Sequence, residues 1–273
     1  MSHHRKTVAL IGTAAEILAS HHPMTVRQVF YRLVSRQVIE NSRGTYQAVS
    51  KALVAARCEG LIPWEWIEDR LRRPRHVSMW QGLADFADTA AAVYRRDIWA
   101  EQPRRVECWL EKDALSGIFE DALEAYGVTL NVGRGYDGWA SIRNAALRLG
   151  AGDTVLYFGD FDPSGEDMVR SLGERLAALG SRPAIVKCAL TFDDVRRYEL
   201  PPDFTKTTDT RRAAFVARWG DIAVELDALP LDALQERIVA EVENRMDLAA
   251  LGRVRMRETA ERRALAAALG RLA

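Results

Sequence analysis

The sequence predicts an α/β protein in which a parallel β-sheet flanked by helices lies between a helical N-terminal region and a helical tail. Apolar residues in the first 60 positions recur at helical spacing. From residue 105 onward, short apolar runs alternate with amphipathic segments, which is typical of parallel sheets with right-handed crossovers. After residue 210 the pattern is again helical, with breaks near Gly220 and Pro230.

Three short helices are expected in the N-terminal region, over residues 8–20, from Thr25 onward, and over residues 45–58. Thr25 and Gln28 have the spacing of a capping box. Residues 61–67 then form an extended or turn segment that resembles half of a hairpin. Three helices and a hairpin fit a winged helix-turn-helix, a DNA-binding fold. A basic run at 70–76 and a helix at 77–99 lead to the second half.

Four strands are expected in the second half, at residues 106–110, 128–132, 154–158 and 184–190. Helices connect them, and we expect Ser164 to cap the helix after the third strand. The predicted domains are a winged helix-turn-helix at 1–76, a helical linker at 77–104, a metal-binding sheet domain at 105–200 and a helical extension at 201–273.

The charge distribution is asymmetric although the net charge is zero. Residues 1–105 carry a net charge of +6 and residues 106–273 a net charge of −6. A basic first half suits a polyanion and an acidic second half suits a cation site, but ordinary surface charge fits equally well. The three cysteines form no CxxC pair, which disfavours a zinc or disulfide framework. Without a signal-peptide pattern or a run of ~20 apolar residues, a cytoplasmic protein with no membrane contact is expected.

Three carboxylates are expected to meet at one edge of the sheet. Glu111 follows the first strand, Asp160 follows the third, and Asp162 lies two residues later. Carboxyl ends of parallel strands share an edge, where ligands usually bind. Converging carboxylates disfavour one another unless a cation joins them, and Mg²⁺, which Mn²⁺ can replace, prefers oxygen ligands. The alternative is that these carboxylates cap helices.

Two motifs around these residues resemble the signatures of the Toprim domain, which topoisomerases, primases and certain nucleases share. They are Leu110-Glu111-Lys112-Asp113 and Gly159-Asp160-Phe161-Asp162-Pro163-Ser164-Gly165. The resemblance implies a Rossmannoid sheet in which Glu111, Asp160 and Asp162 hold Mg²⁺. The Asp-Pro-Ser-Gly ending is similar to that of topoisomerase VI A subunits and meiotic double-strand-break transesterases. Lys112 either contacts phosphate or is a surface lysine.

A second resemblance to the same proteins lies in residues 25–31. There, the family carries a nucleophilic tyrosine with an arginine four residues earlier, which implies these roles for Tyr31 and Arg27. The two residues share a helix face. A guanidinium at this place can bind phosphate and favour the phenolate, whose ordinary pKa is ~10. The alternative is a tyrosine that packs at a domain edge.

Further DNA contacts are expected from polar residues of the third helix, the basic run and a glycine-rich loop. They are Arg43, Gln47, Lys51, Arg72, Arg73 and Arg134. Residues 200–209 and 224–229 resemble segments of short phage and bacterial proteins of this type. Glu225 and Asp227 are expected to face solvent, the alternative being that they add to the metal site.

The resemblance therefore implies Mg²⁺-dependent cleavage of double-stranded DNA by a nucleoid-associated homodimer, with Tyr31 as the nucleophile. No ATPase module is visible in the sequence, which leaves room for an activating or ATPase partner. Two alternatives remain open. One is a hydrolytic, metal-dependent endonuclease in which Tyr31 is structural, and the other is a non-catalytic DNA-binding regulator.

Overall fold

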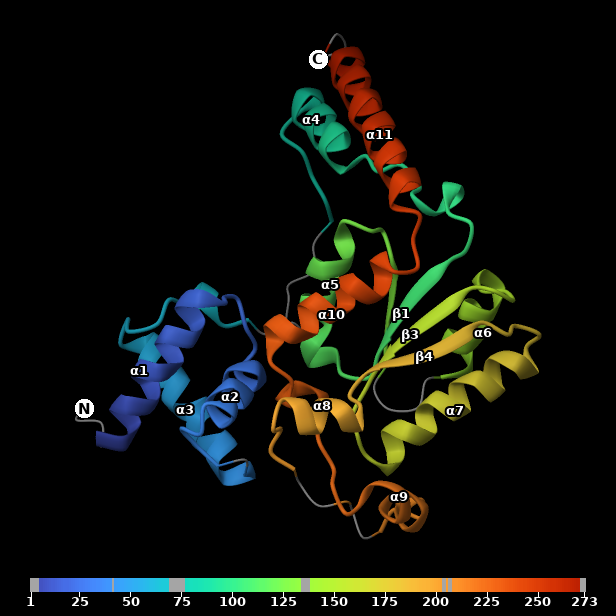
Figure 1. Cartoon of the computed structure of the whole chain (residues 1–273). Coiled ribbons are helices and arrows are strands. Elements are labelled where there is room, and N and C mark those ends of the chain that lie inside the picture. The colour runs from blue at the N-terminus through green and yellow to red at the C-terminus, as the bar shows by residue number, and fades with distance from the viewer. Residues whose placement is uncertain are drawn as a thin grey trace.

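The chain is an α/β protein with a four-stranded parallel sheet flanked by helices, which confirms the predicted fold class (Figure 1). The computed structural model describes residues 5–40, 42–68, 77–133, 138–202, 205 and 208–270. Within these ranges, no helix combines the length and the apolar character that crossing a bilayer requires.

Three helices form the N-terminal unit: α1 (Arg5–Ser20), α2 (Val26–Ser35) and α3 (Arg43–Cys58). The predicted capping box is present, since the Thr25 hydroxyl accepts from the Gln28 amide and the Gln28 side chain accepts from the Thr25 amide at 2.7 Å. Apolar side chains at helical spacing fill the space between the helices, among them Ile17, Leu18, Phe30, Leu33 and Leu53. The α2 helix is thereby fixed at its start and along its inner face.

The segment after α3 differs from the expected hairpin. A 3-10 turn, η1 (Trp64–Trp66), follows Pro63, whose ring removes a ladder donor. Ile67 then pairs with Met24 through a single parallel bridge. The described residues after α3 contain no hairpin, and the basic run at 70–76 lies outside them. The wing therefore stays a prediction.

The sheet consists of β1 (Val106–Leu110), β2 (Thr129–Val132), β3 (Thr154–Phe158) and β4 (Ala184–Ala189), in the order β2-β1-β3-β4. All pairs are parallel, with Leu110 of β1 opposite Phe158 of β3. Every residue of β1 is buried. Since β1 and β3 are adjacent central strands, the residues that follow them emerge side by side.

Helices cover both faces of the sheet. On one side α6 (Trp139–Arg148) and α7 (Pro163–Ala178) pack on a cluster around Trp109 and Tyr157, and on the other α5 (Ser116–Glu124) and α10 (Leu231–Glu243) cover Cys108 and Phe158 (Figure 1). The buried Glu107 belongs to the α6 side, where Arg148 and Asn131 bind it. Shorter elements are η3 (Trp99–Glu101), η4 (Asp113–Leu115), α8 (Phe192–Arg197), α9 (Arg212–Trp219) and η5 (Leu226–Ala228).

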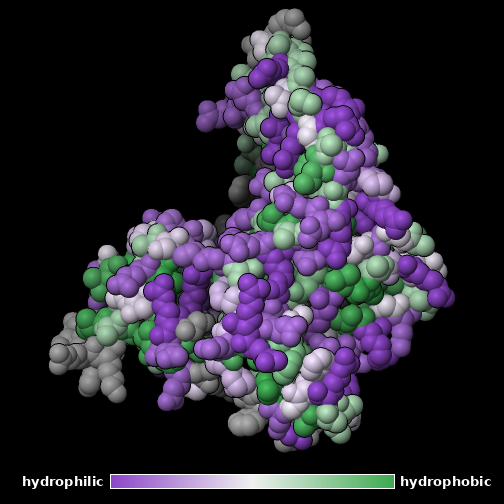
Figure 2. All heavy atoms as spheres, viewed as in Figure 1, coloured by the Kyte–Doolittle hydropathy of each residue, from purple (hydrophilic) through white to green (hydrophobic). Residues whose placement is uncertain are grey.

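A helical arm projects from the body of the molecule, formed by α4 (Leu83–Val93) and α11 (Leu248–Leu269) (Figure 1). The helix expected at 77–99 is shorter, because it begins only after Gly82 and gives way to turns after Val93. The Tyr94 hydroxyl donates to Glu261 at 2.7 Å and holds the base of α4 on α11. Over the face seen in Figure 2, hydrophilic residues predominate and hydrophobic ones form small separate areas.

Candidate active site at the carboxyl edge of the sheet

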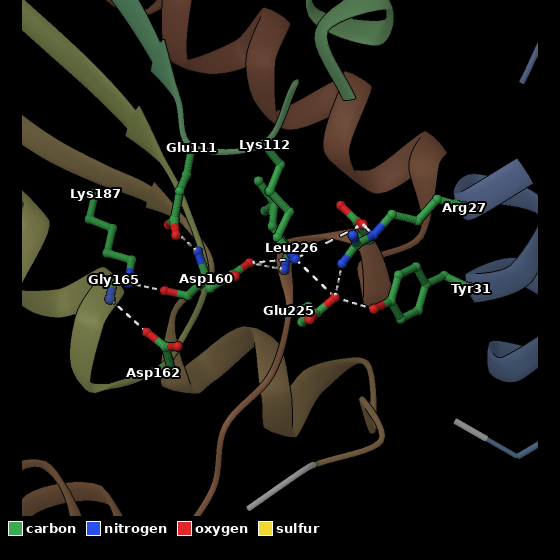
Figure 3. A network of polar contacts seen from close by, with 11 residues as sticks. Arg27, Tyr31, Glu111, Lys112, Asp160, Asp162, Gly165, Lys187, Glu225 and Leu226 are labelled. Carbon is green, nitrogen blue, oxygen red and sulfur yellow. Dashed lines mark hydrogen bonds and ion pairs between the residues drawn. The ribbon is translucent and has the colours of Figure 1, made fainter. Parts of the chain in front are cut away.

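Glu111 and Asp160 lie next to each other at the carboxyl ends of β1 and β3 (Figure 3). The Glu111 amide continues the ladder by donating to the Phe158 carbonyl at 2.9 Å. The Glu111 carboxylate then accepts from the Asp160 amide at 3.0 Å. The sheet thus brings these two residues together in the way that their positions in the sequence suggested.

Two glycines make room for this arrangement. A Cβ at Gly159 would lie 2.4 Å from the Glu111 carboxylate and 2.7 Å from the Tyr157 ring. A Cβ at Gly165 would lie 2.3 Å from the Asp160 carbonyl oxygen. Both distances are far below van der Waals contact, so glycine is required at both ends of the motif.

Asp162 points toward the start of α7 rather than toward Glu111 (Figure 3). Its carboxylate accepts from the Gly165 amide at 2.6 Å, which makes Asp162 the N-cap and Pro163 the first helical residue. The expectation that Ser164 caps this helix was wrong. A proline favours the first helical position, so the residue before it becomes the cap.

The carboxyl edge of the sheet is electrostatically crowded. Burial, followed by the negative charge of Asp160 and then that of Asp162, raises the pKa of Glu111 to about 7. Burial also raises the pKa of Asp160, although Lys112 and the Leu226 amide oppose the shift. Carboxylates held this close favour a bound cation.

Lys112 supplies one such cation from the chain itself. Its ammonium lies 3.0 Å from the Asp160 carboxylate, 3.0 Å from that of Glu225 and 4.0 Å from that of Asp227. Burial would lower the pKa of Lys112, but these three carboxylates raise it above its ordinary value, so it stays charged. Only 14% of the Lys112 side chain is exposed, so the interpretation of Lys112 as a surface lysine was wrong.

Arg27 and Tyr31 project from one face of α2 toward the same region (Figure 3). The Arg27 guanidinium donates to Asp227 and to Glu225, each at 2.6 Å. The Tyr31 hydroxyl donates to the same Glu225 oxygen that Arg27 and Lys112 contact. The tyrosine of the N-terminal unit and the acidic edge of the sheet are therefore linked by Glu225 and Lys112 within one chain.

The expectation that Glu225 and Asp227 face solvent was wrong for Asp227, whose side chain is 1% exposed. Glu225 keeps 45% of its side chain exposed but is also paired with Arg27 and Lys112, and the backbone around both acids is bonded to residues that follow β3. Val224 and Phe161 exchange two backbone hydrogen bonds of 2.9 Å, and the Leu226 amide donates to the Asp160 carboxylate at 2.7 Å. The sequence holds one signal of this placement. Glu225 and Asp227 are two positions apart within an apolar segment, as Asp160 and Asp162 are, and residues two apart in an extended chain point the same way.

The Tyr31 phenol is held in its neutral form. Burial, the hydrogen bond to Glu225 and the charge of that carboxylate raise the pKa of Tyr31, and they outweigh the opposite effect of Arg27. Arg27 does lower the pKa of Tyr31, as expected, but the other influences raise it by more, so the phenol and not the phenolate is favoured. For Glu225, burial alone would raise the pKa, but Lys112, Tyr31 and Arg27 lower it to about 2.

A cavity of about 340 Å³ opens beside these acids. The residues that line it include Asp160, Asp162, Glu225, Thr205, Asp209 and Arg211. Arg211 is bound to Asp209 and Asp167, so its charge is largely matched. The cavity gives a ligand from solvent access to Glu225 and Asp160.

The residues at this edge suit a divalent ion by their chemistry, but their side chains are not arranged as a complete set of metal ligands. Over the described ranges, no group of three His, Cys, Asp or Glu side chains is arranged to hold a metal. Glu111 and Asp160 nevertheless offer the carboxylate oxygens that Mg²⁺ prefers, and their crowding is what a cation relieves. Asp162 shares its carboxylate with the start of α7.

The expected DNA contacts are only partly described. Gln47 and Lys51 are exposed on α3, one helical turn apart, and so share a face. Arg43 begins α3, but its side chain lies outside the described part of the chain. The same holds for the whole of Arg72, Arg73 and Arg134.

A scan against models of known protein families and a search of curated proteins found no match to this chain. The resemblance to Toprim and topoisomerase VI A proteins therefore rests on the motif residues alone.

Proposed function

We propose that the protein cleaves double-stranded DNA with Mg²⁺ and that Tyr31 is the nucleophile on the scissile phosphate. The observation that carries the proposal is that Tyr31 and Arg27 from α2 meet Lys112 and Asp160 from the sheet edge through one shared carboxylate. A nucleophile, two cations and an acidic edge are the parts that phosphoryl transfer needs.

The roles follow from the contacts. Attack by Tyr31 joins its oxygen to phosphorus and breaks the bond from phosphorus to a deoxyribose oxygen. The phenol proton passes through solvent to that released oxygen, which leaves as a hydroxyl, while Arg27 and Lys112 offset the negative charge of the phosphate. Glu111, Asp160 and Asp162 are the residues that would hold Mg²⁺, which supplies further positive charge to the phosphate. The exposed face of α3 with Gln47 and Lys51 suits the duplex beyond the cut.

The finer structural assignments belong to the same proposal. They are a winged helix-turn-helix at 1–76, a Toprim-like domain at 105–200, a homodimer, and a location at the nucleoid with an activating or ATPase partner. Support for the first two comes from the three N-terminal helices and from the parallel sheet with Glu111 and Asp160 at its edge. Since Tyr31 already reaches the acidic edge of its own chain, a second copy is not needed to complete the site in this arrangement.

A denaturing gel tests the nucleophile. Wild-type protein incubated with duplex DNA and Mg²⁺ or Mn²⁺ is expected to form a protein–DNA adduct that survives denaturation, and Tyr31→Phe is expected to abolish it. Tyr94→Phe is the matched control, because Tyr94 also donates to a glutamate that an arginine binds, far from the site. Retention of the adduct in Tyr31→Phe would refute the role of Tyr31.

A specific observation also favours hydrolysis. Tyr31 is 6% exposed and its pKa is raised, both of which hinder a nucleophile. If water attacks instead, Tyr31→Phe will keep cutting DNA and leave free 5′-phosphates. A non-catalytic regulator is favoured by the neutralisation of Asp160 by Lys112, and in that case DNA binding without any cleavage is expected in Mg²⁺ and Mn²⁺.

A further inference from the structure

Three donors from two separate elements converge on a single carboxylate oxygen of Glu225 (Figure 3). The Arg27 guanidinium lies 2.6 Å from this oxygen, the Lys112 ammonium lies 3.0 Å from it, and the Tyr31 hydroxyl donates to it. Two cations and a hydroxyl around one anionic oxygen are also the surroundings that a phosphate oxygen finds in protein sites.

Contacts that do not involve Glu225 hold the two cations in place. The Arg27 Nε donates to the buried Asp227 carboxylate at 2.6 Å. The Lys112 ammonium is paired with Asp160 at 3.0 Å. Removal of the Glu225 side chain would therefore leave a preformed group of donors rather than a collapsed one.

Glu225 and Arg27 are the accessible members of the group. Their side chains are 45% and 41% exposed, compared with 14% for Lys112 and 1% for Asp227. Glu225 also lines the cavity of about 340 Å³ beside the acidic edge. An anion that arrives from this cavity meets Glu225 first, and the displaced carboxylate has solvent to move into.

The exchange would keep the charge balance of the site. Arg27 and Lys112 carry two positive charges against the negative charges of Asp160, Asp227 and Glu225. A phosphodiester group carries one negative charge, as the Glu225 carboxylate does. A phosphodiester in its place therefore adds no uncompensated charge, whereas binding beside Glu225 would.

We propose that Arg27, Tyr31 and Lys112 form a binding site for one phosphodiester group of the DNA backbone, and that Glu225 fills this site until a phosphate displaces it. The inference rests on the proposed function, because it places the scissile phosphate at Tyr31. Glu225 is then an internal competitor that lowers the apparent affinity for phosphate. Only a ligand with further contacts, such as a duplex lying along α3, replaces it efficiently.

Calorimetric titration with inorganic phosphate in EDTA tests the site without metal or cleavage. Glu225→Ala is expected to bind phosphate at least about tenfold more tightly than wild type, because the competitor is gone. Adding Lys112→Gln to Glu225→Ala is expected to remove this gain. Glu261→Gln is the matched control, since Glu261 is bound by Tyr94 and Arg96 on the arm and should leave phosphate binding at the wild-type level.

Glu225→Gln is a second variant in case Glu225→Ala does not fold, because glutamine has the shape of glutamate and its oxygen can still accept the hydrogen bond from Tyr31. A smaller gain in phosphate affinity is expected for it. The inference would be overturned if folded Glu225→Ala and Glu225→Gln both bound phosphate only as tightly as wild type. It would also be overturned if Glu225→Ala kept its gain in phosphate affinity after Lys112→Gln was added.

A short duplex in EDTA forms the second arm of the experiment. Tighter duplex binding by Glu225→Ala identifies the backbone as the source of the phosphate, and a gain for free phosphate alone overturns that assignment. The two proposals fail separately. A gain in phosphate affinity without any DNA adduct in wild type with Mg²⁺ would refute the proposed function only, whereas an adduct without the gain would refute the inference only.

Discussion

The pKa values of two glutamates of the site are shifted in opposite directions, although burial alone would raise both. Burial and the charges of Asp160 and Asp162 raise the pKa of Glu111 to about 7, although the backbone hydrogen bond from the Asp160 amide acts in the opposite direction. Glu225 is in contact with Lys112, Arg27 and Tyr31, so its pKa falls to about 2. The difference arises because Lys112 and Arg27 lie against Glu225 and not against Glu111. Of the two glutamates, Glu111 is therefore the one whose ionised form a bound metal ion would stabilise more.

The pH dependence of stability follows from these shifts in the metal-free protein. Because the pKa of Glu111 rises from 4.5 to about 7 on folding, the folded state binds more protons in this interval, and the free energy of unfolding falls as pH rises through it. Glu111→Gln is expected to flatten this decline. The contribution of Glu225 has the opposite sign, and it is lost as pH falls from 4.5 toward about 2.

Urea unfolding in EDTA at pH 5 and pH 7.5 measures the effect, since Glu225 is ionised at both values. Equal slopes for wild type and Glu111→Gln would contradict the assignment. Added Mg²⁺ is expected to stabilise wild type more at pH 7.5 than at pH 5, because the ion binds the ionised carboxylate.

The helix α7 illustrates how an element and a candidate site share one side chain. Asp162 accepts from the Gly165 amide and starts the helix, and it also contributes to the charge around Glu111. A cap needs only an oxygen acceptor, whereas a ligand for a hard cation benefits from a full negative charge. The two roles therefore respond differently to substitution.

Asp162→Asn is expected to keep the free energy of unfolding within about 0.5 kcal/mol of wild type, because asparagine caps as well as aspartate. Asp162→Ala is expected to cost about 1 kcal/mol. Both variants are expected to weaken Mn²⁺ binding, measured by calorimetry. Mn²⁺ affinity at the wild-type level in Asp162→Asn would restrict Asp162 to the capping role.

Local elements were predictable where their signals lie within a few residues. The bounds of β1 and β3 and the capping box of α2 are as expected, since they depend on short apolar runs and on the pair Thr25 and Gln28. The cap of α7 was misplaced by two residues because both Asp162 and Ser164 are good caps, and the intervening Pro163 decided between them. In the described residues after α3, a 3-10 turn stands where part of a hairpin was expected, which shows that composition alone does not fix a turn.

At the scale of the whole molecule, the site joins parts of the chain that no local pattern connects. Parallel strands made the approach of Glu111 and Asp160 predictable. The approach of α2 to residues 225–227 was not, because a contact between side chains about 200 positions apart leaves no trace in either segment. Only the spacing of Glu225 and Asp227 hinted that their side chains point the same way, and the bridge between Phe161 and Val224 joins their segment to the end of β3.

The tie between the N-terminal helices and this segment has a measurable strength. Arg27→Ala is expected to cost about 2 to 4 kcal/mol in the free energy of unfolding, because it leaves the buried Asp227 carboxylate without its guanidinium. Asp232→Ala is the control. Asp232 pairs with Arg32, which lies on α2 as Arg27 does, but the Asp232 side chain is 62% exposed, so the free energy of unfolding is expected to change by no more than about 0.5 kcal/mol. Equal effects of the two substitutions would contradict the structural role of the buried pair.

Because Arg27 and Asp227 lie far apart along the chain, the site can form only late in the synthesis of the protein. During synthesis from the N-terminus, α2 leaves the ribosome long before its acidic partners do. Neither Tyr31 nor Lys112 can take up its final neighbours until residue 227 has emerged and the intervening sheet has formed. The proposed phosphate site therefore requires both α2 and residues 225–227, and a fragment that lacks either segment cannot form it.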